Sequence, residues 1–465
     1  MLAGIAGVFI LSAVVVIACE RSKSTTSDEE SRVAARKDEL PPGRWYARRG
    51  TGNRLTRKQQ QAIRELESLG DLEGTTTPVT AKGVTTHVKN QVDAAASFYL
   101  SGHAPEAVLM DIDGSELHRW RYGLEDMLPN LPERTRRAHN YWRRAHLFEN
   151  GDILGMFATN IKGLFKIDKD STVIWVRPDL FAHHDLDVAA NGDIYVLTRK
   201  AHVVPRFHEI QPILEDFITV LGADGKTKKS ISILESLENS KWKKTWLEKK
   251  NELQEQCHRY WSRGELSPRT EQLTFCTDPL HTNTLEILDG RLETRISAFR
   301  EGNLLVSLLS IDMIAVVNLE RQQVVWLHSG DYSWQHDAQV VANGNVILFD
   351  NKGPPRKRNA KNKLWSSVIE FNPLTSKTAW RYQGSSKQPL FSSCCGTVQR
   401  LPNGNPLITE TNGGRALEVN PAKRTVWEFH NPHTAGKNAD YVAVLMDLVR
   451  MAPNFPLGWS KASRP

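Results

Sequence analysis

Short apolar runs alternate with turn residues through most of the chain. Pairs of runs are joined by turns at Asn150-Gly151, Asn191-Gly192, Glu301-Gly302, Asn343-Gly344 and Asn403-Gly404. The distance from turn glycine to the next unit-closing Trp is 24 residues for Gly151 and Trp175, 24 for Gly302 and Trp326, and 23 for Gly404 and Trp427. Asn-Gly between apolar runs predicts a hairpin, because both residues tolerate the positive φ of a tight type I′ turn.

The repeating unit predicts a β-propeller. Repeats of roughly 40 residues, each with about four short strands, are typical of propeller blades. Six units fit the pattern, at 96–123, 139–178, 181–230, 281–330, 334–384 and 393–430. We therefore predict an all-β, six-bladed propeller over residues 96–440, in which the unit-closing tryptophans pack between neighbouring sheets.

Two insertions interrupt the repeat. Residues 231–279 are rich in Glu, Lys and Leu, and Trp242, Trp246 and Leu253 are spaced for one face of a helix, which predicts a helical insertion packed on the propeller. Residues 352–364 carry six basic residues and no acid. They form either a solvated loop or a basic lip over an anionic substrate.

The cysteines are compatible with either an oxidising compartment or the cytosol. Cys257 and Cys276 flank the second half of the helical insertion, and they form a disulfide in an oxidising compartment or remain thiols in a cytosolic protein. A bond between the adjacent Cys394 and Cys395 would be strained, so we expect thiols there, or a bond from one of them elsewhere.

The N-terminal region predicts an anchor and a tether. Its first apolar stretch suits a signal-peptide core or a membrane span, and Val16–Cys19 resembles a bacterial lipobox. The basic residues that follow argue for a cytoplasmic body under the positive-inside rule. We expect a membrane-anchored protein on the periplasmic side, with 1–19 as signal, lipoprotein-like or transmembrane anchor, 20–95 as a polar tether with a short helix, and 441–465 as a C-terminal tail.

The composition is typical of a soluble globular domain, and the net charge favours anionic partners. Hydrophobic residues make up 40% and charged residues 24% of the 465 residues, and the net charge is +7. A basic protein favours anionic partners. No nucleic-acid recognition module and no aromatic-basic stacking pattern is present in the sequence, so we expect no nucleic-acid partner.

Polar residues occupy matching positions in several units. Eight residues before the turn glycines stand Arg143, His184, His336 and Gly396, and His281-Thr282-Asn283 opens the remaining unit in the same manner. If these positions begin the innermost strands, they converge at one mouth of the central channel. We call Arg143, His184, His281, Asn283 and His336 the histidine cup.

The residue types of the histidine cup point to two chemistries. No Asp or Glu stands at the matching positions, which disfavours a hard cation, whereas three histidines are a ligand set for zinc. A neutral imidazole can instead attack an electrophilic sulfur or phosphorus, while neighbouring His, Asn and Arg donors stabilise the charged oxygens. Both alternatives remain open on residue types alone.

Several of these segments resemble the bacterial arylsulfate sulfotransferase (arylsulfotransferase) family, whose fold is a six-bladed propeller. The similar segments, within roughly residues 96–450, are His184-Asp185-Leu186-Asp187, His281-Thr282-Asn283, Gln335-His336-Asp337, Phe349-Asp350-Asn351, Gly414–Val419 and Trp427-Glu428-Phe429. The resemblance implies transfer of a sulfuryl group from an aryl sulfate to a phenol, with no nucleotide donor, cofactor or metal.

The resemblance also implies roles for the residues of the histidine cup. His336 would be the nucleophile that is transiently sulfated, with His184 and His281 as catalytic partners and Asn283 binding sulfate oxygens. Arg143 and Arg199 are further candidates for substrate binding. The expected small-molecule partners are an aryl sulfate and a phenol. The N-terminal segment adds the membrane as a partner, and a homodimer is one possible assembly.

One position departs from the family pattern. Where the family has an Arg in a Ser-x-Arg context, this chain has Ser307-Leu308-Leu309. Loss of such a donor costs about 3 kcal/mol of transition-state stabilisation. The alternative function is therefore a non-catalytic, membrane-anchored propeller that binds an anionic ligand or a protein partner. A quinone-cofactor dehydrogenase-like propeller is a third hypothesis, although it would want more blades and acidic calcium ligands.

Overall fold

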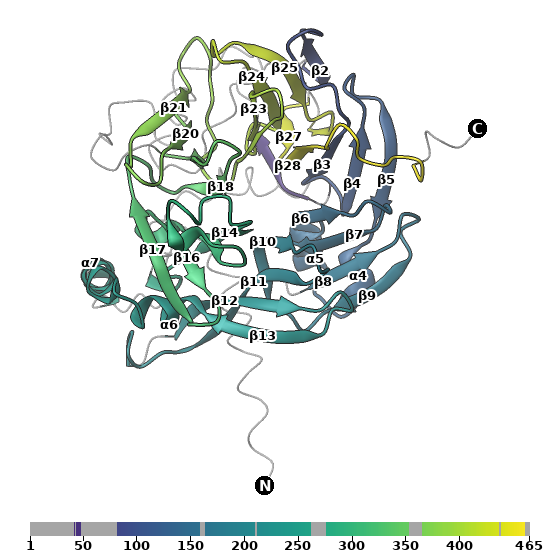
Figure 1. The fold of residues 1–465 in the computed structure, drawn as a ribbon. Helices are drawn as coiled ribbons and strands as arrows, with labels where there is room; N and C mark the ends of the chain where they lie inside the picture. Colours follow the sequence, from purple (N-terminus) through teal and green to yellow (C-terminus); the bar gives the residue numbers. More distant parts are fainter. Residues whose placement is uncertain are drawn as a thin grey trace, which may run out of the picture.

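The computed structural model describes residues 41, 43–47, 81–158, 163–209, 212–261, 276–352, 365–436 and 439–460. In this part of the chain, six antiparallel sheets are arranged around a central axis (Figure 1). The predicted all-β, six-bladed propeller is thereby confirmed. In each sheet, alternate residues of short apolar strands face the neighbouring sheets, and this packing buries most of the inner strands.

Each blade has four strands, which follow one another from the axis outward. Blade 1 contains β28 (Leu445–Arg450), β3 (Ser97–Ser101), β4 (Glu106–Met110) and β5 (Glu116–Arg121); blade 2 contains β6 (Trp142–Leu147), β7 (Ile153–Phe157), β8 (Leu164–Ile167) and β9 (Val173–Arg177); blade 3 contains β10 (Ala182–Val188), β11 (Ile194–Val203), β12 (Pro212–Leu221) and β13 (Thr227–Ser232).

The other three blades have the same order. Blade 4 contains β14 (Thr282–Ile287), β15 (Leu304–Leu308), β16 (Met313–Asn318) and β17 (Gln323–Ser329); blade 5 contains β18 (His336–Val340), β19 (Val346–Asp350), β20 (Ser367–Phe371) and β21 (Thr378–Gln383); blade 6 contains β22 (Thr397–Arg400), β23 (Pro406–Glu410), β24 (Arg415–Val419) and β25 (Thr425–His430), with β2 (Gly83–His87) added at its outer edge.

The propeller extends beyond residues 96–440 in both directions. The innermost strand of blade 1 is β28, which lies in the predicted C-terminal tail and pairs with β3. At the other end, β2 lies in the predicted tether and pairs with β25. The ring therefore closes by joining the two ends of the described chain, which the local repeat could not indicate because the closing strands lie outside it.

The hairpin turns differ from the predicted type I′ turn. Phe148 N donates to Asp152 O (2.9 Å) and Gly151 N donates to Phe148 O (2.9 Å), so the loop has three residues. Only Gly151 has positive φ, at 87°. Asn150 instead accepts a hydrogen bond from Asp152 N through its side chain. The glycine is needed because it takes the left-handed position that closes this loop.

The unit-closing tryptophans join neighbouring blades, as predicted. Trp120 in β5 donates its indole N–H to Gly151 O of blade 2 (2.9 Å). Trp175 in β9 donates to Ala223 O of blade 3 (3.1 Å), and Trp427 in β25 donates to Ile112 O of blade 1 (2.9 Å). Each indole therefore packs apolar area between two sheets while its polar group is satisfied.

The predicted insertion at 231–279 contains α6 (Ile233–Glu238) and α7 (Lys243–Trp261), which lie at the outer edge of the propeller (Figure 1). Trp246 and Leu253 are buried in the same apolar cluster as strands of blades 3 and 4, as the helical spacing predicted. The insertion also contains a disulfide between Cys257 and Cys276.

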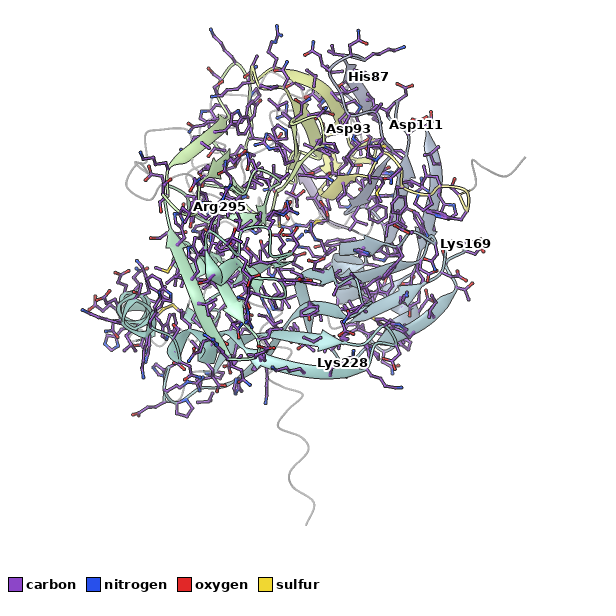
Figure 2. All side chains as sticks on the ribbon, viewed as in Figure 1. His87, Asp93, Asp111, Lys169, Lys228 and Arg295 are labelled. Atoms are coloured by element: carbon purple, nitrogen blue, oxygen red, sulfur yellow. A yellow bond between two sulfur atoms is a disulfide. The ribbon has the colours of Figure 1, made fainter. Side chains whose placement is uncertain are left out.

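The remaining elements are short. They are α4 (Leu124–Met127), α5 (Glu133–His139), the 3₁₀ helices η2 (Ser297–Phe299) and η3 (Leu309–Ile311), and a small sheet of β1 (Trp45–Ala47), β27 (Tyr441–Ala443) and β26 (Thr434–Ala435). Charged residues lie on the outer rim of the propeller: the labelled Lys169 and Lys228 in Figure 2 are paired with Asp170 and Asp193.

The predicted anchor at 1–19 lies outside the described residues, as do most of the tether, its short helix, and residues 353–364 of the basic insertion. None of the helices in the described part of the chain has both the length and the apolar character needed to cross a membrane.

Candidate active site

The histidine cup forms where the inner strands begin. The pairing register shifts near the first residues of β6, β10, β14 and β18, so each of these strands carries a bulge at the same end of the propeller axis. His184 and His281 have positive φ values of 58° and 45°. Bulges and left-handed residues re-aim side chains at a strand end. They bring residues from different blades together here: the His184 and His281 ring centroids are 4.7 Å apart.

His336 is held as a neutral imidazole with a defined tautomer. Its Nδ1 lies 2.8 Å from Asn351 Oδ1 and 3.0 Å from Trp334 O. The Asn351 Nδ2 donates to Ser392 O and Cys395 O, which fixes Oδ1 as an acceptor. Nδ1 therefore carries the proton, and Nε2 keeps its lone pair.

The pKa of His336 is lowered to about 4. Burial is the largest cause, followed by the positive charge of Arg143; the hydrogen bond with Asn351 opposes them. At neutral pH the imidazole is therefore uncharged, which is the form of histidine that can act as a nucleophile.

His184 is also neutral and oriented. Its Nδ1 lies 2.8 Å from Nδ1 of His183, which also accepts from Arg199 Nη2 at 3.0 Å. Because a guanidinium can only donate, His183 Nδ1 is the acceptor and His184 Nδ1 carries the proton. Burial, then the charges of His281, His183 and Arg143, hold the pKa of His184 well below its ordinary value.

His281 has an acidic partner. Its Nδ1 is 2.7 Å from Asp278 Oδ2, and its main-chain N–H donates to the other oxygen of Asp278 (3.1 Å). Burial raises the pKa of Asp278, but His281 and Arg199 outweigh it and hold that pKa below its ordinary range. Asp278 is therefore an anion that holds the His281 ring in place through Nδ1.

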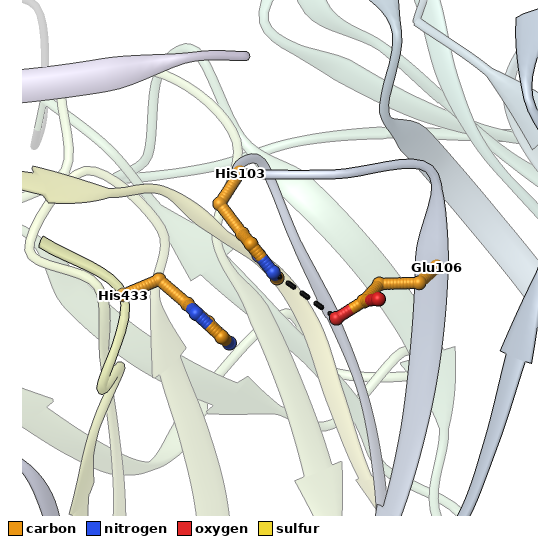
Figure 3. A group of neighbouring side chains, drawn as sticks. All are labelled: His103, Glu106 and His433. Atoms are coloured by element: carbon orange, nitrogen blue, oxygen red, sulfur yellow. Dashed lines mark ion pairs between the residues drawn. The ribbon is translucent and has the colours of Figure 1, made fainter. Parts of the chain in front are cut away.

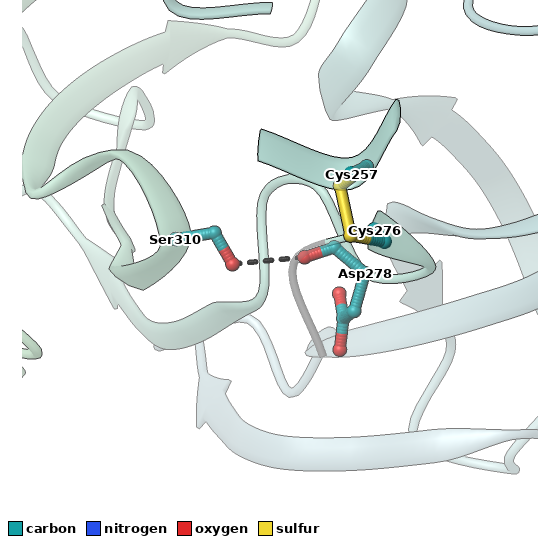
Figure 4. Close-up of a disulfide and its surroundings, with 4 residues drawn as sticks. All are labelled: Cys257, Cys276, Asp278 and Ser310. Carbon is teal, nitrogen blue, oxygen red and sulfur yellow. Dashed lines mark hydrogen bonds between the residues drawn. A yellow bond between two sulfur atoms is a disulfide. The ribbon is translucent and has the colours of Figure 1, made fainter. Parts of the chain in front are cut away.

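The disulfide fixes the segment that carries this pair. Cys276 is two residues before Asp278, and its bond to Cys257 ties the segment to α7 (Figure 4). Ser310 supports the same segment by donating to Asp278 O (2.8 Å). The helical insertion thus contributes to the site through Asp278 and His281, a link that residue spacing did not reveal.

Arg143 is the unpaired cation of the histidine cup. It is 5% exposed, and among the described residues it makes no ion pair or hydrogen bond. Its charge lowers the pKa of both His184 and His336, so it lies near both imidazoles. A buried guanidinium without a partner is costly unless an anion pairs with it. The charge and burial of Arg143 are therefore suited to pairing with an anion.

The other two predicted binding residues are already engaged. Arg199 lies 3.5 Å from Asp278 and 3.8 Å from Asp216, in addition to its contact with His183. Through these contacts Arg199 holds His183 and Asp278, which in turn position His184 and His281. Asn283 donates to Gln335 O (2.8 Å) and so positions the main chain next to His336. One N–H of its amide stays available for a ligand.

Leu309, the departure from the family pattern, begins η3 and is buried beside His281, to whose carbonyl its N–H donates (3.3 Å). It contributes no donor from its side chain. The basic insertion begins close by: Lys352 Nζ lies 3.2 Å from the ring centroid of Trp334, two residues before His336.

Three acidic residues lie near the cup, and two of them, Asp185 and Asp337, directly follow the predicted His184 and His336. Arg144 pairs through Nε with Asp185 (2.7 Å), through Nη1 with Asp447 (2.7 Å) and through Nη2 with Asp337 (3.2 Å). We call these four residues the Arg144 network. The repeated His-Asp dipeptides at 184–185 and 336–337 were the sequence signal that could have predicted it.

The geometry does not favour zinc in the cup. Within the described ranges, the group of three His, Cys or acidic side chains with ligand atoms close enough for one ion is His103, Glu106 and His433, near the end of β3 (Figure 3). There Glu106 already pairs with Arg119 and Arg121, and the two imidazoles stack face to face with centroids 3.3 Å apart. Stacked rings cannot both direct in-plane lone pairs at one cation.

Comparison with known proteins gives one informative match. Residues 148–432 match the model of the arylsulfotransferase (ASST) family. No curated protein matches the chain. Among solved structures, a protein of unknown function from Bacteroides caccae is 10% identical with a TM-score of 0.45, covering 76% of this chain and 99% of that one; virginiamycin B lyase from Staphylococcus aureus is 6% identical with a TM-score of 0.33, covering 64% and 72%.

Proposed function

The chain belongs to the arylsulfotransferase family, and from this premise we propose that it moves a sulfuryl group from an aryl sulfate to a phenol through a covalent intermediate on His336. The observation that carries the proposal is the buried Arg143, which has no partner among the described residues and lies near His184 and His336, the latter with an unprotonated Nε2. Arg143 binds the sulfate oxygens, and His336 supplies the electron pair.

In the first step, His336 Nε2 attacks sulfur. The N–S bond forms while the S–O bond to the donor phenol breaks, and His281 gives a proton to the leaving oxygen. Asp278 holds the His281 ring through Nδ1, so that Nε2 faces the reacting oxygen for this transfer. Charge on the transferred group is stabilised by Arg143, by the amide of Asn283, and by His184 once the anion has raised its pKa.

In the second step, the acceptor phenol loses its proton to His281 as its oxygen attacks sulfur. The N–S bond breaks and neutral His336 is restored. Splitting one displacement into two steps at a single nucleophile gives ping-pong kinetics.

The test is intact-mass spectrometry of the full chain after brief mixing with nitrophenyl sulfate. We expect one sulfuryl group per chain, discharged by added phenol, and no adduct in His336→Ala. His87→Asn is the matched control, because His87 lies on the outer rim and pairs with Asp113 rather than with the cup. It should acquire the adduct like the native chain.

A second candidate function rests on Leu309. Without a donor at this position, the cup could bind an anion and not transfer it. Absence of an adduct and of phenol release with several aryl sulfates, in a protein that still binds inorganic sulfate, would favour this anion-binding propeller and would refute the transferase.

We also propose that the propeller is membrane-anchored on the periplasmic side. The disulfide between Cys257 and Cys276 supports an oxidising compartment, since structural disulfides persist there. Cell fractionation followed by protease treatment of intact spheroplasts tests the placement: cleavage of the propeller is expected, and full protection would refute it.

A further inference from the structure

Two consecutive thiols stand beside the histidine cup. Cys394 and Cys395 precede β22, and in the described part of the chain they are the cysteines without a disulfide. Cys395 is buried with φ 60°, and Gly396 follows with φ 97°. Two left-handed residues in succession turn the main chain sharply, and this turn holds the thiols at the end of the axis where His336 lies.

Cations favour ionisation of this thiol pair. Arg44 Nη2 donates to Cys394 Sγ (3.3 Å), and Cys394 shares a side-chain hydrogen bond with Cys395. This bond, together with the charges of Arg143 and Arg44, outweighs burial and lowers the pKa of Cys395 well below its ordinary value. The same bond and burial raise the pKa of Cys394. Cys395 is therefore the more acidic of the two thiols.

The thiol pair is connected to His336 by two hydrogen bonds through Asn351. The carbonyl of Cys395 accepts from Asn351 Nδ2 (2.6 Å), and Asn351 Oδ1 holds His336 Nδ1 (2.8 Å). A displacement of Cys395 therefore changes the group that sets the tautomer of His336.

We propose that Cys394 and Cys395 form a vicinal dithiol site for thiophilic centres that take two sulfur ligands, such as trivalent arsenicals and soft metal cations, and that occupation of this site disables His336. With an organic arsenoxide, two S–H bonds are lost, two As–S bonds form, and the arsenoxide oxygen leaves with both protons as water. No oxidation state changes. The binding claim stands by itself, whereas the loss of transfer rests on the proposed function.

Binding is tested with phenylarsine oxide on the full chain carrying Cys19→Ser, which removes the remaining cysteine. Intact mass, measured before any sulfate ester is added, should show one phenylarsenic group per chain. Cys394→Ser and Cys395→Ser should each lose it, because one thiol cannot close the ring. No group on the parent protein, or an unchanged group in both variants, would overturn the site.

The link to His336 is tested by NMR of the chain labelled with ¹⁵N-histidine. The His336 signals are identified by their absence in His336→Asn, and those of the rim residue by their absence in His87→Asn. Phenylarsine oxide should shift the His336 signals and leave those of His87 unchanged. Unshifted His336 signals on an arsenical-loaded chain would refute the link. Neither readout requires turnover, so a failed sulfuryl adduct would refute only the proposed function.

Discussion

Arg143 and Arg144 are consecutive residues of one strand, and both carry a guanidinium into the interior at the propeller axis. Arg144 meets three carboxylates from three other blades, Asp185, Asp337 and Asp447. Arg143 meets none among the described residues and lies among histidines with low pKa values. The difference teaches that charge pairing, rather than residue type or burial, separates the structural part of the axis, around Arg144, from the proposed anion site, around Arg143.

The Arg144 network also ties blades through the main chain. The second oxygen of Asp185 accepts from Leu285 N of blade 4 (2.8 Å), and that of Asp337 accepts from Val398 N of blade 6 (2.8 Å). Each carboxylate therefore serves both the central guanidinium and the next inner strand. Burial disfavours the charge of Arg144, but the three carboxylates outweigh it and raise its pKa well above the ordinary value.

The largest expected effect is on stability. Arg144→Leu leaves three buried carboxylates without their cation, which should lower the free energy of unfolding by about 3–5 kcal/mol. Urea unfolding measures it, with Arg143→Leu as the matched variant one residue away. The latter removes a charge that has no partner in the described ranges, so its stability should equal or exceed that of the native protein. Equal losses in both variants would contradict the comparison.

The next effect is on transfer. Arg143→Gln should reduce the rate of sulfuryl uptake from an aryl sulfate about 10²-fold or more, the size expected for one lost donor at an oxyanion site. Single-turnover release of nitrophenol measures this rate. Arg143→Lys keeps the charge without the planar fork and should be intermediate. A native rate in Arg143→Gln would mean that another residue binds the sulfate.

The difference between these neighbours was only partly visible in the sequence. The spacing from turn glycines to Arg143, His184 and His336 was sufficient to predict that they gather at one end of the axis, because strand register is periodic. The partners were not predictable. Asp447 lies in the closing strand β28, far outside the repeat, and Asp278 lies in the helical insertion, two residues after Cys276. Contacts of this kind depend on where distant segments close the ring, which local patterns do not record.

The predicted role of Arg199 shows the same limit. Its residue type suits sulfate, but Asp216 and Asp278 occupy its guanidinium, so it orients His183 instead. Conversely, Asn351 stands out in the sequence only as part of a motif. Its importance comes from the carbonyls of Ser392 and Cys395, which determine which way its amide points.

Asn351 gives a third, smaller effect that separates orientation from ionisation. In Asn351→Leu, His336 loses its side-chain acceptor, and we expect uptake at neutral pH to fall about tenfold, a loss of about 1.4 kcal/mol. Because this hydrogen bond raises the pKa of His336, the acid limb of the pH–rate profile should move to lower pH.

The native profile provides the control for this variant. Uptake should stay constant from neutral pH almost down to the His336 pKa of about 4. Nitrophenol release at a series of pH values measures both profiles. A native midpoint of about 6.5, the pKa of an ordinary histidine, would show that His336 is not held neutral.

The smallest effect contrasts His336 with its neighbour Asp337 through pH. Burial and Arg143 lower the pKa of His336 to about 4, whereas burial, against Arg144, raises that of Asp337 to about 6. As the pH falls from about 6 to about 4, the unfolded chain takes up the His336 proton first, which lowers stability, and the folded chain takes up the Asp337 proton first, which raises it. Each slope is at most about 1.4 kcal/mol per pH unit.

Single substitutions should therefore tilt the stability profile in opposite directions. His336→Asn removes the destabilising term, so its stability relative to the native protein should rise on acidification over this window. Asp337→Asn removes the stabilising term, so its relative stability should fall. Urea unfolding at several pH values gives the difference in unfolding free energy between each variant and the native protein. The contributions of the other histidines cancel in these differences, because all three proteins share them. If both variants gave stability profiles parallel to that of the native protein, His336 and Asp337 would not differ in ionisation. The division between the histidine cup and the Arg144 network would then rest on geometry alone.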